Sequence, residues 1–201
     1  MSERLSVLVL APFDGTDADA VRDFLFSFNA YSRHRYRYIF DCGVLDDRFD
    51  YSAFDVILVF WTLDVLSPAL SDEVRARIGR TRAPKVLFRQ DDYRDVRATA
   101  AAMRGLGIQL VLTCVDEADH ATFYSREQIP TLEACETVLP GYVPEYLRRY
   151  AASAGSARPI DVGYRSRAMP FYLGDVGHAK SLIADRFQAV ALRYDLRCDI
   201  S

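Results

Sequence analysis

The sequence predicts an α/β fold built as a Rossmann-like, doubly wound layer of parallel strands. Short apolar runs alternate along the chain with longer segments whose apolar residues recur at helical spacing, and this alternation is typical of βαβ units. The runs at 5–10 and 55–60 are apolar almost throughout, as expected of strands that are covered on both faces of a parallel sheet. Because crossovers between parallel strands are right-handed, these units predict a doubly wound layer.

The strands of this layer are expected at 5–10, 36–40, 55–60, 85–88 and 109–113. The run at 36–40 alternates in character, whereas the run at 55–60 is apolar and is expected in the middle of the sheet. Between the first two strands, apolar residues form one face of a helix that Thr16 or Asp17 can cap; they are Val21, Phe24, Leu25, Phe28 and Tyr31.

The later strands are also separated by expected helices. One of them spans 92–104 and is ended by Gly105 and Gly107. The remaining segments are a short helix that begins at Ser71, a weak helix at 117–126, a short extended piece at 137–141, and a helix at 144–150 with a proline in its first turn.

After residue 150 the composition changes. Residues 151–157 are small, as in a linker. Strand-like segments at 159–164 and 197–201 then flank one helix, whose apolar face consists of Ala179, Leu182, Ile183, Phe187, Val190, Ala191 and Tyr194. Two parallel strands with one helix leave strand edges unpaired and one face uncovered.

The domain organisation follows from this change. We expect a Rossmann-like domain at 1–150, a hinge at 151–158, and the incomplete start of a second βαβ domain at 159–201. The last segment is expected to pack on the first domain, on another chain, or on sequence absent from these 201 residues.

The composition excludes several classes of protein. The formal net charge is −3, whereas a general nucleic-acid binder needs a basic face. No run approaches the 18 or so apolar residues of a membrane span, and the start does not resemble a signal peptide. The cysteines and histidines stand far apart, so no metal site is expected. Isolated cysteines are typical of buried thiols and favour a cytoplasmic location.

Ligands of open parallel sheets bind outside the carboxyl ends of the strands, and one polar cluster there is dense. It follows the strand at 85–88 and consists of Arg89, Gln90, Asp91, Asp92 and Tyr93. This set can hydrogen-bond a polyhydroxylated ligand, and a desolvated carboxylate can act as a base. The alternative is a solvated turn in which Asp91 or Asp92 caps the next helix.

Other candidates follow other strands. Asp14 and Thr16 stand before a helix, where backbone N–H groups can take an anion or hydroxyl, although simple capping is favoured. Thr62 follows the third strand beside Trp61, which either stacks on a ligand or fills the core. No GxGxxG follows a strand and no phosphate-binding lysine loop is present, which argues against a nicotinamide or P-loop nucleotide site.

A second basic group lies near the end of the chain. Arg165 and Arg167 follow a strand-like segment, and Lys180 lies in the last helix. Arginines near a helix N-terminus suit a diphosphate, and the alternative is a solvated basic loop.

Several short strings resemble one family. Phe88-Arg-Gln-Asp-Asp-Tyr93, Thr113-Cys114, Leu139-Pro-Gly-Tyr-Val-Pro144, Ile160-Asp-Val-Gly-Tyr-Arg165 and Asn29-Ala-Tyr-Ser-Arg-His34 together resemble the spore-maturation-type glycosyltransferase-like proteins. These proteins are similar to two-domain GT-B glycosyltransferases, and the resemblance covers most of the chain.

This resemblance implies a function. The amino-terminal domain would hold a sugar-bearing or small-molecule acceptor, and the carboxyl-terminal domain would hold a nucleotide sugar, with no metal and no further cofactor required. A catalytic base would be Asp91, Asp92 or Asp14, the acceptor would contact Arg89, Gln90, Tyr93, Thr16, Thr62 and Tyr142, and the departing diphosphate would contact Arg165, Arg167 and Lys180. Most of the donor domain is missing from this chain, which is therefore expected to be truncated and inactive alone.

Two other functions remain open. A lone Rossmann-like domain can act as a non-enzymatic binding or assembly module and dimerise through its terminal βαβ segment. A phospho-receiver domain is a weaker variant of this module, because it needs an acidic pair after the first strand and an aspartate after the third. This chain has Pro-Phe-Asp at 12–14 and Trp61-Thr62 at those positions, which argues against a receiver. A hydrolase ranks last because no GxSxG elbow is present.

Overall fold

The structure is a computed structural model that describes residues 3–13, 15, 18–42, 48–151, 158–166 and 169–200. The chain divides into two compact units, Met1–Pro144 and Glu145–Ser201. The division therefore lies within the helix that was expected at 144–150, and most of the hinge predicted at 151–158 falls outside the described residues.

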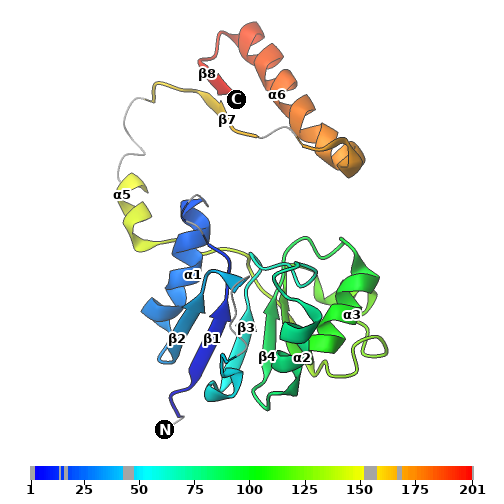
Figure 1. The fold of residues 1–201 in the computed structure, drawn as a ribbon. Helices are drawn as coiled ribbons and strands as arrows, with labels where there is room; N and C mark the ends of the chain where they lie inside the picture. The colour runs from blue at the N-terminus through cyan, green and yellow to red at the C-terminus, as the bar shows by residue number, and fades with distance from the viewer. Residues whose placement is uncertain are drawn as a thin grey trace. The chain divides into compact units, whose positions relative to one another are not determined.

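The first unit is built on a sheet of six parallel strands in the order β2-β1-β3-β4-β5-β6 (Figure 1). Their bounds are β1 Ser6–Leu10, β2 Arg35–Ile39, β3 Val56–Val59, β4 Lys85–Phe88, β5 Ile108–Thr113 and β6 Ala134–Thr137. The α/β class and the Rossmann-like parallel sheet are thus confirmed. The apolar β3 lies inside the sheet, as its pattern predicted, and the alternating β2 lies at its edge.

Four α-helices connect these strands, α1 Asp19–Tyr31, α2 Asp72–Arg80, α3 Val96–Leu106 and α4 His120–Phe123, with 3-10 turns η2 Tyr51–Ala53 and η3 Glu117–Asp119 among the described residues. The helix expected at 92–104 begins only at Val96, because Asp91 and Asp95 adopt left-handed backbone and Arg94 N–H donates to Asp91 C=O in a turn. At its other end, Gly107 adopts the left-handed C-cap conformation, whereas Gly105 lies inside the helix.

Two apolar cores cover the two faces of the sheet. On one face, Phe24 and Leu25 of α1 pack with Val9 of β1. On the other face, Ile78 of α2 and Met103 of α3 belong to the core that contains Leu8 and Leu10 of β1. Successive side chains of a strand point to opposite faces, so a single apolar strand serves both cores.

The strand order also positions a ligand site. The chain passes from β1 to its neighbour β2 on one side and then crosses to β3 on the other side of β1. Such a reversal separates the connections at the carboxyl ends of the strands and leaves a crevice there, which is where open α/β sheets bind their ligands.

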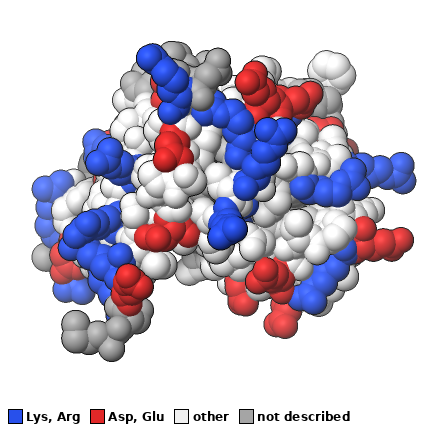
Figure 2. All heavy atoms as spheres, turned by 60° about the horizontal axis from the view of Figure 1, so that its bottom comes forward, with Lys and Arg blue, Asp and Glu red and all other residues white. Residues whose placement is uncertain are grey.

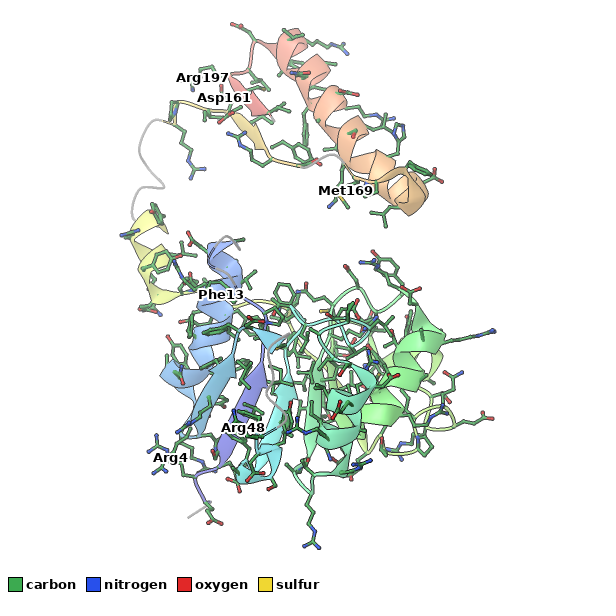
Figure 3. The ribbon with its side chains drawn as sticks, in the orientation of Figure 1. Arg4, Phe13, Arg48, Asp161, Met169 and Arg197 are labelled. Carbon is green, nitrogen blue, oxygen red and sulfur yellow. The ribbon has the colours of Figure 1, made fainter. Side chains whose placement is uncertain are left out.

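The second unit contains two parallel strands and one long helix. Its elements are η4 Glu145–Leu147, α5 Arg148–Ala151, β7 Val162–Tyr164, η5 Phe171–Leu173, α6 Gly174–Tyr194 and β8 Cys198–Ile200. An ion pair between Asp161 and Arg197, labelled in Figure 3, ties the start of one strand to the start of the other at 3.0 Å.

Charge is mixed on the face of the molecule that Figure 2 shows, where basic and acidic side chains are interspersed. None of the helices in the described ranges is both long and apolar enough to cross a membrane.

Candidate functional site

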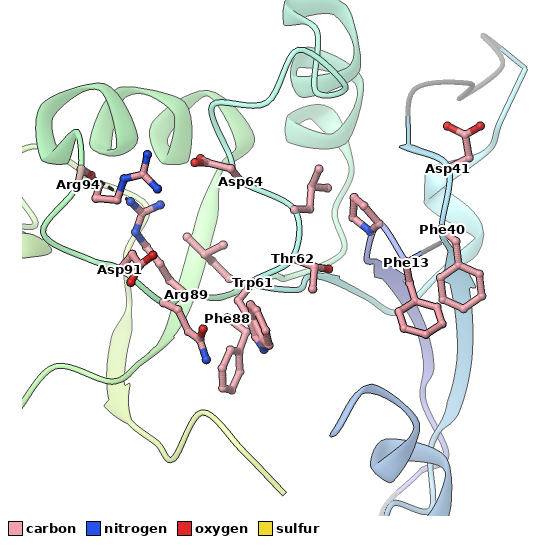
Figure 4. A pocket seen from close by; sticks show the side chains of 14 residues that line it. Phe13, Phe40, Asp41, Trp61, Thr62, Asp64, Phe88, Arg89, Asp91 and Arg94 are labelled. Atoms are coloured by element: carbon pink, nitrogen blue, oxygen red, sulfur yellow. Dashed lines mark hydrogen bonds between the residues drawn. The ribbon is translucent and has the colours of Figure 1, made fainter. Parts of the chain in front are cut away.

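A pocket of about 740 Å³ opens at the carboxyl ends of β1 to β4, across the position where the chain reverses (Figure 4). The loops after these four strands supply nearly all of its lining, which consists of Pro12, Phe13, Phe40, Asp41, Trp61, Thr62, Leu63, Asp64, Leu87, Phe88, Arg89, Gln90, Asp91 and Arg94. The pocket therefore occupies the place that the sheet topology favours for a ligand.

One side of the pocket is aromatic. Phe13 and Phe40 follow β1 and β2 with their ring centroids 5.9 Å apart. Figure 4 shows both rings on the side away from Arg89, Asp91 and Arg94, with Asp41 beside Phe40. Trp61 follows β3 and packs on Phe60 at 5.4 Å between centroids. These rings give the pocket an apolar surface beside its polar groups.

The middle of the pocket holds polar atoms without partners. Trp61 Nε1 and Thr62 Oγ1 are buried, and neither has a hydrogen bond to any residue that the structure describes. A buried donor without a partner is costly, by roughly 1–3 kcal/mol. These atoms are therefore suited to a ligand that supplies the missing acceptors and donors.

The opposite side of the pocket is charged. It contains Arg89, Asp91 and Arg94 from the loop after β4, with Asp64 from the loop after β3. Arg89 is only 7% exposed, and its Nη2 donates to the carbonyl oxygen of Arg94 at 3.1 Å. The side chain of Gln90 donates across to the carbonyl oxygen of Pro140 at 3.4 Å. The loop is thus held to its own far end and to the segment that follows β6.

Backbone strain is concentrated in the same loop. Asp91 has a φ of 55° and Asp95 a φ of 47°, a left-handed conformation that side chains other than glycine adopt at a cost of roughly 1–3 kcal/mol. Aspartate tolerates this region better than most residues. Residues held in this way cluster at functional sites, and Asp91 itself lines the pocket.

Asp92 lies elsewhere, although it is the next residue. It is 6% exposed and is absent from the pocket lining. Its carboxylate accepts hydrogen bonds from Thr113 Oγ1 of β5, at 2.5 Å, and from the hydroxyl of Tyr124. Burial, followed by the bond to Asp92, raises the pKa of Tyr124, so the phenol stays protonated and remains a donor.

The thiol of Cys114 lies against the same loop. Its Sγ donates to the carbonyl oxygen of Arg89 at 3.8 Å. Burial raises the pKa of Cys114, and the charges of Asp92 and Asp91 raise it further. A thiol with a raised pKa is a poor nucleophile at neutral pH, so Cys114 supports the loop and not the chemistry.

The structure brings together some of the residues that the sequence singled out. Thr62, Arg89, Gln90 and Asp91 line the pocket. Tyr93 is 61% exposed and does not belong to the lining.

The described lining of this pocket does not include the other predicted residues. Tyr142 donates from its hydroxyl to the hydroxyl of Tyr31 at 2.7 Å. Arg165 of the second unit is paired with Asp199, and Lys180 lies on α6 with its side chain exposed. Asp14, Thr16 and Arg167 lie outside the described residues.

Sequence reasoning missed Phe40, Asp41, Asp64 and Arg94 as pocket residues. Phe40 and Asp41 stand at the end of the predicted second strand, where the carboxyl-end rule alone could have pointed to them. Arg94 was not considered as a pocket residue because residues 92–104 were expected to form a helix and not a loop.

The fold and this pocket define an α/β protein with a parallel sheet and a pocket at its topological reversal. Comparison of the chain with protein family models, with curated proteins and with solved structures finds no match. In the part of the chain that the structure describes, no group of three or more His, Cys, Asp or Glu side chains is arranged to hold a metal ion.

Proposed function

We propose that this chain carries the acceptor-binding part of a glycosyltransferase of the GT-B type, and that the pocket of the first unit holds a sugar-bearing or small-molecule acceptor. The observation that carries the proposal is the composition of the pocket, in which aromatic rings face carboxylates and guanidinium groups. A sugar has the complementary surface, because its C–H groups form apolar patches and its hydroxyls both donate and accept hydrogen bonds.

Asp91 is the proposed base. Of the three carboxylates considered from the sequence, Asp91 lines the pocket, Asp92 is engaged by two hydroxyls, and Asp14 lies outside the described residues. A carboxylate oxygen of Asp91 would accept the proton of an acceptor hydroxyl. The hydroxyl oxygen would then bond to the anomeric carbon of a nucleotide sugar, and the bond from that carbon to the diphosphate would break with its electron pair.

The diphosphate would contact basic groups of the second unit. Lys180 is exposed on α6, and Arg165 would have to exchange its bond to Asp199 for one to phosphate. Arg167 is the third candidate. The positive charge of these side chains would stabilise the departing diphosphate.

The proposal is tested by measuring the binding of sugars to the whole chain. Calorimetric titration with neutral monosaccharides and glycosides is expected to give saturable binding, and Thr62→Val is expected to weaken that binding about 3- to 10-fold, because it removes an otherwise unpaired hydroxyl from the pocket. Thr122→Val, the same change at an exposed site on α4, should leave affinity unchanged. If only nucleotide sugars bind, and Thr62→Val weakens their binding, the pocket is a donor site and the acceptor assignment is wrong.

A binding or assembly module without catalysis is the second candidate. It is favoured by the apolar side chains that α6 exposes, among them Phe187, Val190 and Leu192. A dimer that forms through this helix is the expected form under this hypothesis. Light scattering of the purified chain, and of a variant with Val190→Asp, distinguishes it, because a monomer in both cases contradicts assembly through α6.

A further inference from the structure

Two guanidinium groups lie on one side of the pocket, and neither forms an ion pair with the described carboxylates that line the pocket beside them. Figure 4 shows the side chains of Arg89 and Arg94 next to each other on the side away from Phe13 and Phe40. Within the described residues, Arg89 makes one side-chain hydrogen bond, to the carbonyl oxygen of Arg94. Its Nε is buried without a partner, and neither arginine is ion-paired with a carboxylate there.

The burial of the Arg89 guanidinium without an ion pair is electrostatically unfavourable. A guanidinium as buried as Arg89, which is 7% exposed, loses most of its hydration, and buried charges in proteins are normally paired. A second positive charge beside it adds repulsion. An anion bound between the two would remove both penalties, and the planar fork of arginine suits the paired oxygens of a carboxylate or phosphate.

The loop that presents the arginines is held in place. Arg89 follows β4 directly, and its carbonyl oxygen accepts from Cys114. Asp92 is anchored to Thr113 of β5 and to Tyr124, the residue that follows α4. Because the loop is fixed from both sides, the backbone that carries the two arginines does not depend on the ligand for its position. Preorganisation of this kind reduces the entropy that binding costs.

The carboxylates of the pocket restrict the kind of ligand that can carry the anionic group. The carboxylates of Asp41, Asp64 and Asp91 line the same pocket, so three negative side chains stand against two positive ones and the lining carries a formal charge of −1. A ligand with charge spread over its length would be repelled by these carboxylates. A ligand with a single anionic group at the arginines and neutral hydroxyls elsewhere satisfies the guanidinium groups and gives the neighbouring carboxylates hydroxyl donors.

We propose that Arg89 and Arg94 bind the anionic group of an acidic acceptor sugar, either the carboxylate of a uronic acid or the phosphate of a sugar monophosphate. The sugar part of this inference rests on the proposed function, whereas the oxyanion site stands on the two arginines alone. Both groups present the same oxyanion chemistry, and the ligands below separate them.

The experiment compares matched ligands on the whole chain by calorimetry at constant ionic strength. The probes are glucose, glucuronate, glucose 6-phosphate and inorganic phosphate. We expect at least one of the two acidic sugars to bind roughly 10- to 100-fold more tightly than glucose, because charge-assisted hydrogen bonds form. Arg89→Gln and Arg94→Gln should reduce that preference to near unity, and Arg97→Gln, an exposed change on α3, should not alter it.

The outcomes separate this inference from the function on which it rests. If glucose binds as well as both acidic sugars, the oxyanion site is wrong and the sugar pocket stands. If inorganic phosphate binds as tightly as glucose 6-phosphate and Arg94→Gln abolishes both, the oxyanion site stands and the sugar proposal loses its support. If no probe binds at millimolar concentration, both are contradicted. Arg94 is exposed, so Arg94→Gln keeps the test valid even if Arg89→Gln fails to fold.

Discussion

Tyr124→Phe removes a single hydroxyl from beneath the loop that forms the charged side of the pocket. That hydroxyl donates to the buried carboxylate of Asp92, whose other donor is Thr113 Oγ1. Tyr124 is 5% exposed and Asp92 is 6% exposed, so water cannot readily replace the lost donor. The variant therefore tests whether Asp92 is a structural anchor and not a free carboxylate.

The size of the effect follows from these contacts. A hydrogen bond to a charged group contributes about 1.5–3 kcal/mol to stability, and the phenylalanine ring fills the same space as the tyrosine ring. We expect the free energy of unfolding of Tyr124→Phe to fall by about 2 kcal/mol. For a chain of this size, that loss lowers the melting temperature by roughly 4–8 °C.

Urea denaturation followed by circular dichroism measures the change. Tyr93→Phe is the matched control, because it removes a hydroxyl from the same loop at a position that is 61% exposed, and it should change stability by less than about 0.5 kcal/mol. If Tyr124→Phe is as stable as Tyr93→Phe, Asp92 does not depend on its buried donors, and its exclusion as the catalytic base fails.

Three further changes test other parts of the structure. The free energy of unfolding of Asp91→Ala should be about 1–2 kcal/mol lower than that of Asp91→Gly, because alanine disfavours the left-handed backbone at this position. Gly79→Ala should lower the free energy of unfolding by about 1–3 kcal/mol, since the new Cβ would stand 2.6 Å from the carbonyl oxygen of Gly105. Arg197 holds the pKa of Asp161 at about 2. The ionised carboxylate therefore stabilises the folded second unit above about pH 4, and this stabilisation is lost as the pH falls toward 2. Hydrogen exchange of the second unit measures the loss of stability.

Each of these has a contrary outcome. Equal denaturation midpoints for Asp91→Ala and Asp91→Gly would show that the backbone at 91 is not strained. Gly105→Ala has no atom within 4 Å of its new Cβ and should stabilise its helix by roughly 0.5–1 kcal/mol, so equal losses at both glycines would refute the close contact of α2 and α3. Asp161→Asn should show at pH 7 the protection factors, corrected for the intrinsic exchange rate, that the native chain shows at pH 2. Identical protection factors of the native chain at pH 5 and pH 2 would refute the pairing.

The elements that the sequence predicted well are those with a strong local pattern. The apolar runs became β1 and β3, and the helical face that includes Phe24 and Leu25 became α1 with those two residues in the core. β6 was missed because its residues, Ala134–Thr137, lack an apolar run. It forms because it pairs with β5 at the edge of the sheet, a contact that local pattern does not contain.

The charged loop shows the same limit at the level of single residues. Asp91 and Asp92 are adjacent and identical in chemistry, and the sequence offered both as a base. Thr113 and Tyr124 are distant in the chain from Asp92, and their hydroxyls hold it away from the pocket. The left-handed turn at Asp91 then places its side chain in the pocket lining.

The sequence by itself determined the α/β class and the parallel sheet, because hydrophobic periodicity is a local property that decides which segments become strands and helices. Only the tertiary structure decided the strand order, the reversal beside β1 and the set of side chains that meet there. These depend on which strands pair across long stretches of chain, and pairing is settled by the packing of the whole sheet. The aromatic and charged sides of the pocket are thus a product of topology, assembled from loops that the sequence holds far apart.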